Sequence, residues 1–499
     1  MQKNAHLLRT SNPTVRICAA HLHHHTLPEA PMTKQRFFSF LALAAAMSII
    51  ISAASCGSMN SSLPTNNTSA AITAQSTTTG SLIFSNDSLL RPEGGSEPAI
   101  SIGTNALMGI TSLRWLLFGT DLWTGPAGSV PTFRGVIDEG LQPHGNRTAL
   151  GGGDADIEIG STGTLHETSL IFLVNPAFNN AQLGVAYVRC ADAASFDLSS
   201  CTSRILDQAG ADRQWITSEG SRVYISYHDA GNSTLIRVQR SDDDGLTWRK
   251  VGNPIVGQGR TTANATFNNT AGPIVADPVT HNVYSIYTTG EPGIQKATSA
   301  NHNNVFVSRS TDFGETWTSV LVFHAPLFTA LNNVFPALAV DPTNGHLYAT
   351  WSDGKTVSFS ASSDQGQTWS TAVSVNVAPA NTAIFPWVAA FNGVVDVVYY
   401  GTTAASNSSG AVWNVYMAQT TDAGSTFTQS VVSHDSNHTG VICTEGIACA
   451  PGTRNLLDLF EVAINPQTGL ASIAYTDDTL STTPSGDPLP QIVLAQQAH

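Results

Sequence analysis

The chain has 499 residues, with 22 Lys and Arg against 36 Asp and Glu and a formal net charge of −14. This acidic balance excludes a protein that binds mainly nucleic acid, because such binding depends on clustered basic side chains. The 41 Gly, 24 Pro and 41% hydrophobic residues indicate a turn-rich globular protein and favour a β fold.

The N-terminal part contains an export signal. Residues 1–31 precede a Met that is followed by a complete signal, and we interpret them as an extension that is either not translated or dispensable. In residues 32–56, Lys34 and Arg36 come before an apolar stretch that is too short for a permanent membrane helix. The stretch ends in Ala53-Ala54-Ser55-Cys56, which resembles the lipobox of bacterial lipoproteins, in which the Cys is lipidated. An ordinary cleavage site is the alternative.

The signal is followed by a linker and one large domain. Residues 57–85 are rich in Ser, Thr and Asn and predict a solvated tether. Residues 86–499 are predicted to form a single domain. We therefore expect the protein beyond the bacterial inner membrane, either as a cell-envelope lipoprotein or as a secreted protein.

Four cysteines lie in the exported domain, as two pairs that are close in sequence. In an oxidising compartment the economical disulfides are Cys190 with Cys201 and Cys443 with Cys449. A four-Cys metal site is the alternative, although neither pair has the two-residue spacing that is usual for zinc.

Four octapeptides, at residues 241–248, 310–317, 362–369 and 420–427, share the pattern Ser/Thr-x-Asp-x-Gly-x-Thr-aromatic. In such a turn the Asp accepts hydrogen bonds from N–H groups just downstream, the Gly adopts a positive φ, and the aromatic ring returns to the core. We therefore give a structural role to Asp243, Gly245, Trp248, Asp312, Gly314, Trp317, Asp364, Gly366, Trp369, Asp422, Gly424 and Phe427.

The octapeptides resemble the Asp-box, or BNR, repeats of the sialidase superfamily and of other secreted β-propellers. The resemblance implies an all-β propeller of four-stranded blades. It also implies that the octapeptides lie in the turns between strands 3 and 4 on the back, and that ligands bind on the front around the central channel. Similar blade openings occur seven times, so seven blades are favoured, with six, as in sialidases, as the alternative. The openings lie at Glu97, Asp154, Asp212, Ala271, Phe335, Phe385 and Asp458.

The sequence also predicts how the ring closes and which other elements to expect. A strand from residues 81–84 is expected to complete the last blade. Almost no helix is expected, because the repeated unit consists of short alternating strands separated by turn residues.

Aromatic residues followed by acids end three predicted second strands: Tyr227-His228-Asp229, Trp351-Ser352-Asp353 and Tyr475-Thr476-Asp477. Rings and carboxylates gathered on one face suit a sugar. Asp229, Asp353, Tyr475 and Asp477 are therefore candidate catalytic residues, and Trp351 is a candidate ligand-binding residue. The alternative is that each Asp caps its own turn.

Two arginines lie at blade openings that follow the cysteine pairs. Disulfide-braced loops could hold Arg213 and Arg454 over the channel as a clamp for an anion. Alternatively, these arginines pair with Asp212, Asp458 or Glu461 and brace neighbouring blades.

The sequence departs from the sialidase pattern. That pattern has three Arg on the substrate carboxylate, a Tyr nucleophile paired with a Glu, and an Asp acid/base. Here the Arg-Ile-Pro motif is missing, with Arg134 as its nearest echo, and no Arg lies between Arg309 and Arg454. Arg454 and Tyr475, with Glu461 or Glu445, match the last part of the pattern only loosely.

No cofactor is predicted from the sequence. It shows no zinc-binding helix, phosphate-binding loop or nucleophile elbow. A calcium ion held by Asp229, Asp353 and Asp477 stays an unsupported possibility.

Two functions remain open. The favoured one is binding of an extracellular glycan or protein through the front face, with membrane contact through the lipid anchor alone. The alternative is an exo-acting glycoside hydrolase of sialidase-like fold.

Overall fold

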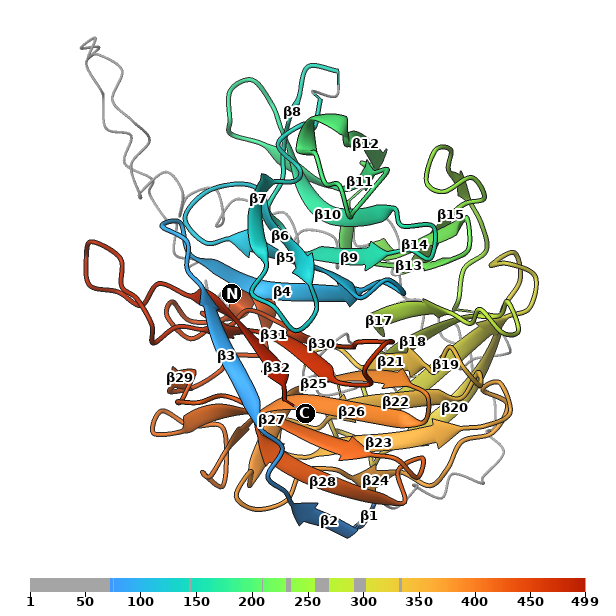
Figure 1. Cartoon of the computed structure of the whole chain (residues 1–499), viewed down its shortest axis with the longest axis vertical. Coiled ribbons are helices and arrows are strands. Elements are labelled where there is room, and N and C mark those ends of the chain that lie inside the picture. Colours follow the sequence, from blue (N-terminus) through green and yellow to red (C-terminus); the bar gives the residue numbers. More distant parts are fainter. Residues whose placement is uncertain are drawn as a thin grey trace, which may run out of the picture. The chain divides into compact units, whose positions relative to one another are not determined.

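The computed structural model of the chain describes residues 72–498, apart from residues 75, 143–144, 209, 230–234, 256–268, 291–301 and 332–333. The predicted signal and Cys56 lie outside the described residues. In the described part, regular structure is almost entirely β (Figure 1), with two short 3-10 helices, η1 (Leu198–Ser200) and η3 (Gly446–Ala448). No helix within this part has the length and apolar character that crossing a membrane requires.

Seven sheets, each with four antiparallel strands, follow one another along the chain. Blade 1 contains β4 (Gly95–Ile102), β5 (Leu107–Arg114), β6 (Thr120–Pro126) and β7 (Thr132–Val136). Blade 2 contains β9 (Ala155–Ile159), β10 (Leu165–Val174), β11 (Ala181–Cys190) and β12 (Thr202–Asp207), with β8 (Thr148–Leu150) added beside β10. Blade 3 contains β13 (Ala211–Glu219), β14 (Arg222–Asp229), β15 (Ile236–Ser241) and β16 (Arg249–Lys250).

The second half of the ring repeats the pattern. Blade 4 contains β17 (Asn269–Ala276), β18 (Val283–Thr289), β19 (Asn304–Ser310) and β20 (Thr318–His324). Blade 5 contains β21 (Ala337–Val340), β22 (Leu347–Ser352), β23 (Val357–Ser362) and β24 (Val373–Ser374). Blade 6 contains β25 (Thr382–Phe391), β26 (Val394–Thr402), β27 (Val412–Thr420) and β28 (Thr426–Val431), with β29 (His438–Thr439) beside β27. Blade 7 contains β30 (Glu461–Ile464), β31 (Ala471–Asp477), β32 (Gln491–Gln497) and β3 (Phe84–Leu89).

The first strands of the blades form a closed ring. In the order β4, β9, β13, β17, β21, β25 and β30, each first strand packs on the next, and β30 packs on β4. Apolar side chains fill the space between neighbouring sheets; for example, Met417 of blade 6 and Ile473 of blade 7 belong to one buried cluster. The all-β propeller with seven blades is therefore confirmed, and the six-bladed alternative is wrong.

The ring closes through a pairing of the two ends of the domain. Strand β3 pairs antiparallel with β32, from Phe84 opposite Gln497 to Leu89 opposite Ile492. In Figure 1 the blue β3 runs alongside the red β32. The predicted closing strand is thus present, although it begins at Phe84 rather than at residue 81.

The segment before β3 differs from the predicted tether. Strands β1 (Thr73–Ala74) and β2 (Ser76–Thr79) pair parallel with β24 and β28, so β1 adds an outer strand to blade 5 and β2 adds one to blade 6. The physical reason is that an outer strand offers unpaired backbone groups, and the threonines of this segment favour an extended backbone. The ring therefore takes up the last part of the Ser/Thr-rich linker.

The four octapeptides occupy the turns between the third and fourth strands of blades 3, 4, 5 and 6. In the first of them, Asp243 accepts hydrogen bonds from Thr247 N (2.7 Å) and Thr247 Oγ1 (2.6 Å), and Ser241 Oγ accepts one from Gly245 N (2.8 Å). The glycines have φ between 76° and 87°. In the third octapeptide, the hydrogen bonds from Thr368 lower the pKa of Asp364 to about 2.

The aromatic residue of each turn also links neighbouring blades. The ring of Trp248 packs edge-on against Tyr187 of blade 2, with centroids 4.7 Å apart. The ring of Phe427 packs in the same way against Phe359 of blade 5, at 5.2 Å. These turns therefore stabilise contacts between blades as well as the hairpins themselves.

The other three blades have different third-to-fourth connections, for identifiable reasons. In blade 2 the disulfide between Cys190 and Cys201 spans this turn. In blade 7 the third and fourth strands come from opposite ends of the domain, so no turn joins them. In blade 1 the turn between β6 and β7 is short and contains Gly128, with φ of 89°.

Candidate functional site

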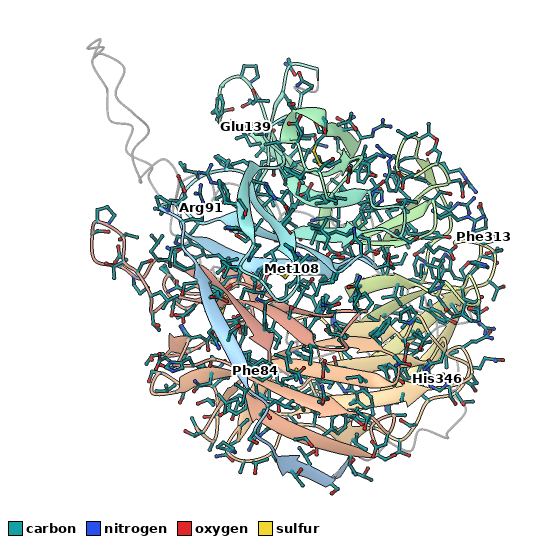
Figure 2. The ribbon with its side chains drawn as sticks, viewed as in Figure 1. Phe84, Arg91, Met108, Glu139, Phe313 and His346 are labelled. Atoms are coloured by element: carbon teal, nitrogen blue, oxygen red, sulfur yellow. A yellow bond between two sulfur atoms is a disulfide. The ribbon has the colours of Figure 1, made fainter. Side chains whose placement is uncertain are left out.

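The chemistry-bearing residues lie at one end of the ring, which we call the front: the end at which the first strands begin. Because the strands of a blade are antiparallel, the third strand ends at the opposite end, the back, together with the octapeptides. Phe313, in the octapeptide of blade 4, and His346, in the turn between the first two strands of blade 5, lie on the same side of the molecule (Figure 2).

Several first strands begin with an irregularity that turns one side chain. The pairing register shifts between Ser96 and Ala99 in blade 1 and between Asp212 and Gln214 in blade 3. The residues at these shifts have left-handed backbone, with φ of 55° at Glu97 and 38° at Arg213. A bulge of this kind redirects a side chain at the cost of local strain. Here it lets Glu97 and Arg213 meet from different blades.

These two residues belong to a closed channel floor, which we define as Glu97, Arg213, Trp215, Phe335 and Trp387. Arg213 Nη1 donates to Glu97 Oε1 at 3.2 Å, and the guanidinium lies 3.8 Å from the centroid of the Trp215 ring. The Trp215 ring packs on Phe335 at 5.4 Å and on Trp387 at 5.3 Å. Side chains from blades 1, 3 and 6 and from the connection into blade 5 therefore fill the channel at this level.

The floor keeps unused hydrogen-bonding groups. Arg213 Nε and Nη2 and Glu97 Oε2 are buried and have no hydrogen-bond partner among the described residues. Burial, with a further contribution from the negative charge of Asp154, raises the pKa of Glu97 well above its usual range. Buried polar groups usually have partners, so unused ones indicate a place for water or for a ligand.

Four further residues form the channel mouth: Asp154, Asp212, Arg454 and Asp458. Arg454 Nε donates to Asp458 Oδ1 at 3.2 Å, and Arg454 Nη2 donates to Asp458 Oδ2. Asp212 Oδ1 accepts from the backbone N of Arg213 at 3.0 Å. Asp154 and Asp212 are partly exposed, whereas Asp458 is buried.

The electrostatics show that the mouth and the floor form one cluster. Burial raises the pKa of Asp154 to about 6; the charges of Asp212 and Asp458 add to the rise, and those of Arg213 and Arg454 oppose it. Burial and the charge of Asp458 also raise the pKa of Asp212. Carboxyl groups with raised pKa values at a strand-end cluster are typical of functional sites.

The connection into blade 7 positions Arg454 and Asp458. Asn455 Nδ2 donates to Asp478 Oδ2 at 2.8 Å, and its backbone O accepts from Ser96 Oγ at 2.9 Å. His438 Nδ1 lies 2.9 Å from the same Asp478 oxygen. The connection is thus fixed to blades 1, 6 and 7, which limits the movement of Arg454.

More acids line the first strands below the mouth. Asp154 directly precedes β9, and Asp156 and Glu158 follow it within that strand, two residues apart. Glu461 lies on β30. Asp156 Oδ2 accepts from Ile216 N (2.8 Å), Glu158 accepts from Ser101 and Ser218, and Glu461 Oε2 accepts from Ile100 N (3.0 Å). These hydrogen bonds join neighbouring blades, which gives these three acids a structural role.

The structure brings the two predicted arginines together but gives them partners. Arg454 pairs with Asp458, as the bracing alternative predicts. Arg213 pairs with Glu97, which the sequence analysis did not name as a partner. Both arginines lie in the channel cluster, but neither is an unpaired clamp.

One disulfide lies elsewhere than expected. Both predicted pairings, Cys190 with Cys201 and Cys443 with Cys449, are confirmed. The second lies in the front connection that carries Arg454. The expectation that the first braces the loop holding Arg213 is wrong, because it spans the β11–β12 turn at the back and β12 separates it from Arg213.

The predicted catalytic acids stay within their own blades. Asp229 pairs with Arg237 at 2.7 Å. Asp353 Oδ1 accepts from the backbone N of Lys355 and of Thr356, so it caps its own turn. Asp477 Oδ1 accepts from Thr479 N and Oγ1, and burial raises its pKa to about 6.

The two predicted aromatic site residues are part of the core. Trp351 is fully buried, and its ring stacks on Phe323 with centroids 5.2 Å apart. Tyr475 is 2% exposed and its hydroxyl donates to Asn86 Oδ1 at 2.8 Å. Side chains alternate along a strand, and these two point into the space between sheets. Both rings are therefore buried, and a ligand-binding role for Trp351 stays a prediction.

Among the described residues no three His, Cys, Asp or Glu side chains are grouped so that they could hold a metal ion. The calcium site suggested for Asp229, Asp353 and Asp477 is therefore not formed. Two cavities lie away from the channel: one of about 490 Å³ beside Glu139, Leu198 and Cys201, and one of about 140 Å³ beside Trp248. Figure 2 shows Glu139 at the outer edge of the molecule.

From the sequence, the mouth acids were recognised only as blade openings or as bracing partners of the arginines, and not as site residues. A usable signal was present, since Glu97, Asp154, Asp212 and Asp458 each begin one of the seven openings. Two exposed front-loop rings were missed as well: Phe178, between β10 and β11, and Phe328, between β20 and β21. They are 42% and 68% exposed and have φ of 52° and 71°.

Several solved structures are similar to this chain at low sequence identity. No protein-family model matches the sequence, and no curated protein is significantly similar to it. An ulvan lyase, a polysaccharide lyase, matches with a TM-score of 0.49 and 12% identity, over 82% of this chain and 95% of that one. The intramolecular trans-sialidase from Ruminococcus gnavus matches with a TM-score of 0.38 and 12% identity, over 81% of this chain and 94% of that one. The Aleuria aurantia lectin matches with a TM-score of 0.41 and 12% identity, over 68% of this chain and 94% of that one.

Proposed function

We propose that this chain is an exported propeller that binds an extracellular glycan at its channel mouth. The observation that carries the proposal is the cluster of Asp154, Asp212, Arg454 and Asp458 above a closed floor. A few convergent polar groups suit a small polar ligand. Partly exposed carboxylates and a guanidinium accept from and donate to sugar hydroxyls.

Two further features support a sugar ligand. The floor contains aromatic rings beneath unused polar atoms of Arg213 and Glu97. The exposed rings of Phe178 and Phe328 are held on front loops in a strained backbone conformation. Strain in exposed aromatic residues is a feature of ligand-contacting loops, and a flat ring stacks well on the apolar face of a sugar.

Export and anchoring are part of the same proposal. The two disulfides fit an oxidising compartment, and lipidation of Cys56 would attach the ring to a membrane through residues 57–72. Expression of a Cys56→Ala variant tests the anchor. We expect the protein to move from the membrane fraction to the soluble fraction, and continued membrane association would contradict lipidation at this residue.

Glycan binding is tested by applying the purified domain, residues 72–499, to a panel of neutral, acidic and amino-containing oligosaccharides. Wild-type protein is compared with Asp154→Asn and Asp212→Asn. Asp435→Asn is the matched control, because Asp435 is an exposed aspartate that pairs with the equally exposed His434. We expect binding by wild-type and control proteins and about a tenfold loss in the mouth variants. Absence of binding across the panel would refute the proposal.

A second candidate function, hydrolysis of a glycosidic bond, is favoured by one observation. The pKa of Asp154, raised by burial to about 6, suits a general acid that protonates the leaving oxygen of a glycoside. Asp458, hydrogen-bonded to Arg454, is the second acid of such a pair. Fluorogenic glycosides test this activity. If the protein is a hydrolase, we expect turnover that is abolished in Asp154→Asn and preserved in Asp435→Asn.

A further inference from the structure

The channel cluster has more acids than arginines. Within the described residues the channel cluster contains four acids, Glu97, Asp154, Asp212 and Asp458, and two arginines. Each arginine already pairs with one acid, Arg213 with Glu97 and Arg454 with Asp458. Two carboxyl groups, those of Asp154 and Asp212, are left without an arginine of their own.

These two carboxyl groups are the ones that a ligand can reach. Both are partly exposed, whereas Glu97 and Asp458 are buried. Asp212 accepts one hydrogen bond from the backbone of Arg213. No described group donates a hydrogen bond to the carboxyl group of Asp154, although its backbone O accepts from Gln214. The mouth therefore presents two acids without an ion-pair partner of their own among the described residues.

A second observation concerns unused polar atoms in the same cluster. Arg213 and Glu97 have side chains that are 4% and 1% exposed, yet Arg213 Nε and Nη2 and Glu97 Oε2 are unpartnered. Together they are two donors and one acceptor. Buried polar groups usually have partners, so these atoms indicate a place for a water molecule between the floor and a ligand at the mouth.

We infer that the site takes an amino sugar with a free, protonated amine, with the ammonium beside Asp154 and Asp212. This inference rests on the proposed glycan binding and specifies its substrate class. An ammonium supplies the missing cation. A sugar carboxylate, as in a uronic acid or a sialic acid, would add a negative charge to a cluster that already has an excess of them.

The pKa shifts agree with this electrostatic argument. Burial raises the pKa of Asp154 and of Asp212, and the neighbouring acids raise them further. Arg213, Arg454, Glu97 and Asp458 are the other charged groups that face Asp154. A bound ammonium would stabilise the ionised carboxylates, so its affinity should rise between pH 5 and pH 6.5, as Asp154 loses its proton.

The test compares three short ligands of similar size: a β-1,4-linked glucosamine disaccharide, its di-N-acetylated form, and a disaccharide that contains glucuronate. Affinities are measured by calorimetry at pH 6 in low salt, with the domain of residues 72–499. We expect the free-amine disaccharide to bind at least tenfold more tightly than the acetylated one, and the glucuronate disaccharide to bind most weakly. The amine preference should shrink as salt is raised.

Variants separate this site from general attraction to an acidic protein. Asp154→Asn and Asp212→Asn should each remove most of the amine preference, and Asp435→Asn should keep it. Thermal unfolding confirms that each variant is folded. Equal affinity for the amine and the acetylated disaccharide, or an equal loss in the Asp435 control, would overturn the amino-sugar inference and leave glycan binding intact. If no oligosaccharide binds, the proposed function fails together with it.

Discussion

Glu97 and Arg213 are 116 residues apart in the sequence, and their side chains meet at 3.2 Å at the centre of the ring. One comes from the first strand of blade 1 and the other from the first strand of blade 3, and each has a left-handed backbone conformation. The pair is almost completely buried. A contact of this kind both closes the channel and sets the charge balance of the mouth above it.

The first prediction concerns this ion pair. Arg213→Met leaves Glu97 buried without its partner and should lower the free energy of unfolding by about 3 to 5 kcal/mol. The double variant Glu97→Gln with Arg213→Met should lose less than the sum of the two single variants, because neither member then keeps an uncompensated charge. Urea unfolding of the four proteins measures the coupling; strictly additive losses would contradict an interaction between the two side chains.

The second prediction concerns stability and pH. Burial raises the pKa of Asp156 to about 6 and the pKa values of Glu158 and Asp396 to about 7, whereas an unfolded carboxyl titrates near 4. Between these values the folded protein binds more protons than the unfolded one, so the free energy of unfolding falls as pH rises from about 4 to about 7. Thermal scans at a fixed rate should give a higher midpoint at pH 5 than at pH 8.

The pH dependence has its own control. Glu158→Gln should make the midpoint less dependent on pH, because a group that titrates between pH 4 and pH 7 has been removed. Asp364 acts in the opposite sense and at lower pH, since its pKa is lowered to about 2. The stability that it contributes is lost only below about pH 4. A midpoint that rises from pH 5 to pH 8 would contradict the assignment of raised pKa values.

The third prediction concerns the octapeptide turns. Gly424 has φ of 86°, and an added Cβ would lie 2.3 Å from Cε1 of Phe359 in the neighbouring blade. Gly424→Ala should therefore destabilise the protein by about 1 to 3 kcal/mol, through overpacking and backbone strain. Gly410→Ala is the matched control, because no heavy atom lies within 4 Å of its added Cβ. Urea midpoints that shift equally in the two variants would contradict this role for the turn.

The fourth prediction concerns the N-terminal strands. A domain that starts at residue 81 lacks β1 and β2 but keeps β3, and we expect it to fold with reduced stability. A domain that starts at residue 91 lacks β3, which leaves β32 with an unpaired edge and blade 7 with three strands. We expect aggregation or loss of cooperative unfolding, measured by size-exclusion chromatography and circular dichroism. Equal behaviour of the two truncations would show that β3 is dispensable for closure.

The parts of the fold that could be predicted from sequence are those formed by residues that are close together in the chain. The hydrogen bonds of the octapeptide turn lie within the octapeptide itself, as those made by Gly245 and Thr247 show. The pattern can therefore be recognised in the sequence wherever it occurs. The blade openings are equally local, and each of the seven lies either within the first strand of its blade or just before that strand. Blade 7 lacks an octapeptide because its third and fourth strands are not consecutive, as the predicted closing strand from residues 81–84 implied. The register of that strand, with Phe84 opposite Gln497, needed the structure.

The candidate site was less predictable, because it depends on contacts between distant blades. The aromatic-x-Asp pattern at Trp351 and Asp353 indicated a front rim, but strand alternation buries the ring of Trp351, and Asp353 turns to its own backbone. Conversely, Glu97 precedes Pro98 in an ordinary-looking opening. Its left-handed φ and the register shift of β4, which bring its side chain to Arg213, arise from the assembled sheet.

The pairing of β3 with β32 has a consequence for biogenesis. Residues 84–89 are synthesised long before their partners at 491–497. The closing strand must therefore wait, unpaired, until residues 491–497 have left the ribosome. The final contact of the circle thus forms only after the other six blades have been synthesised.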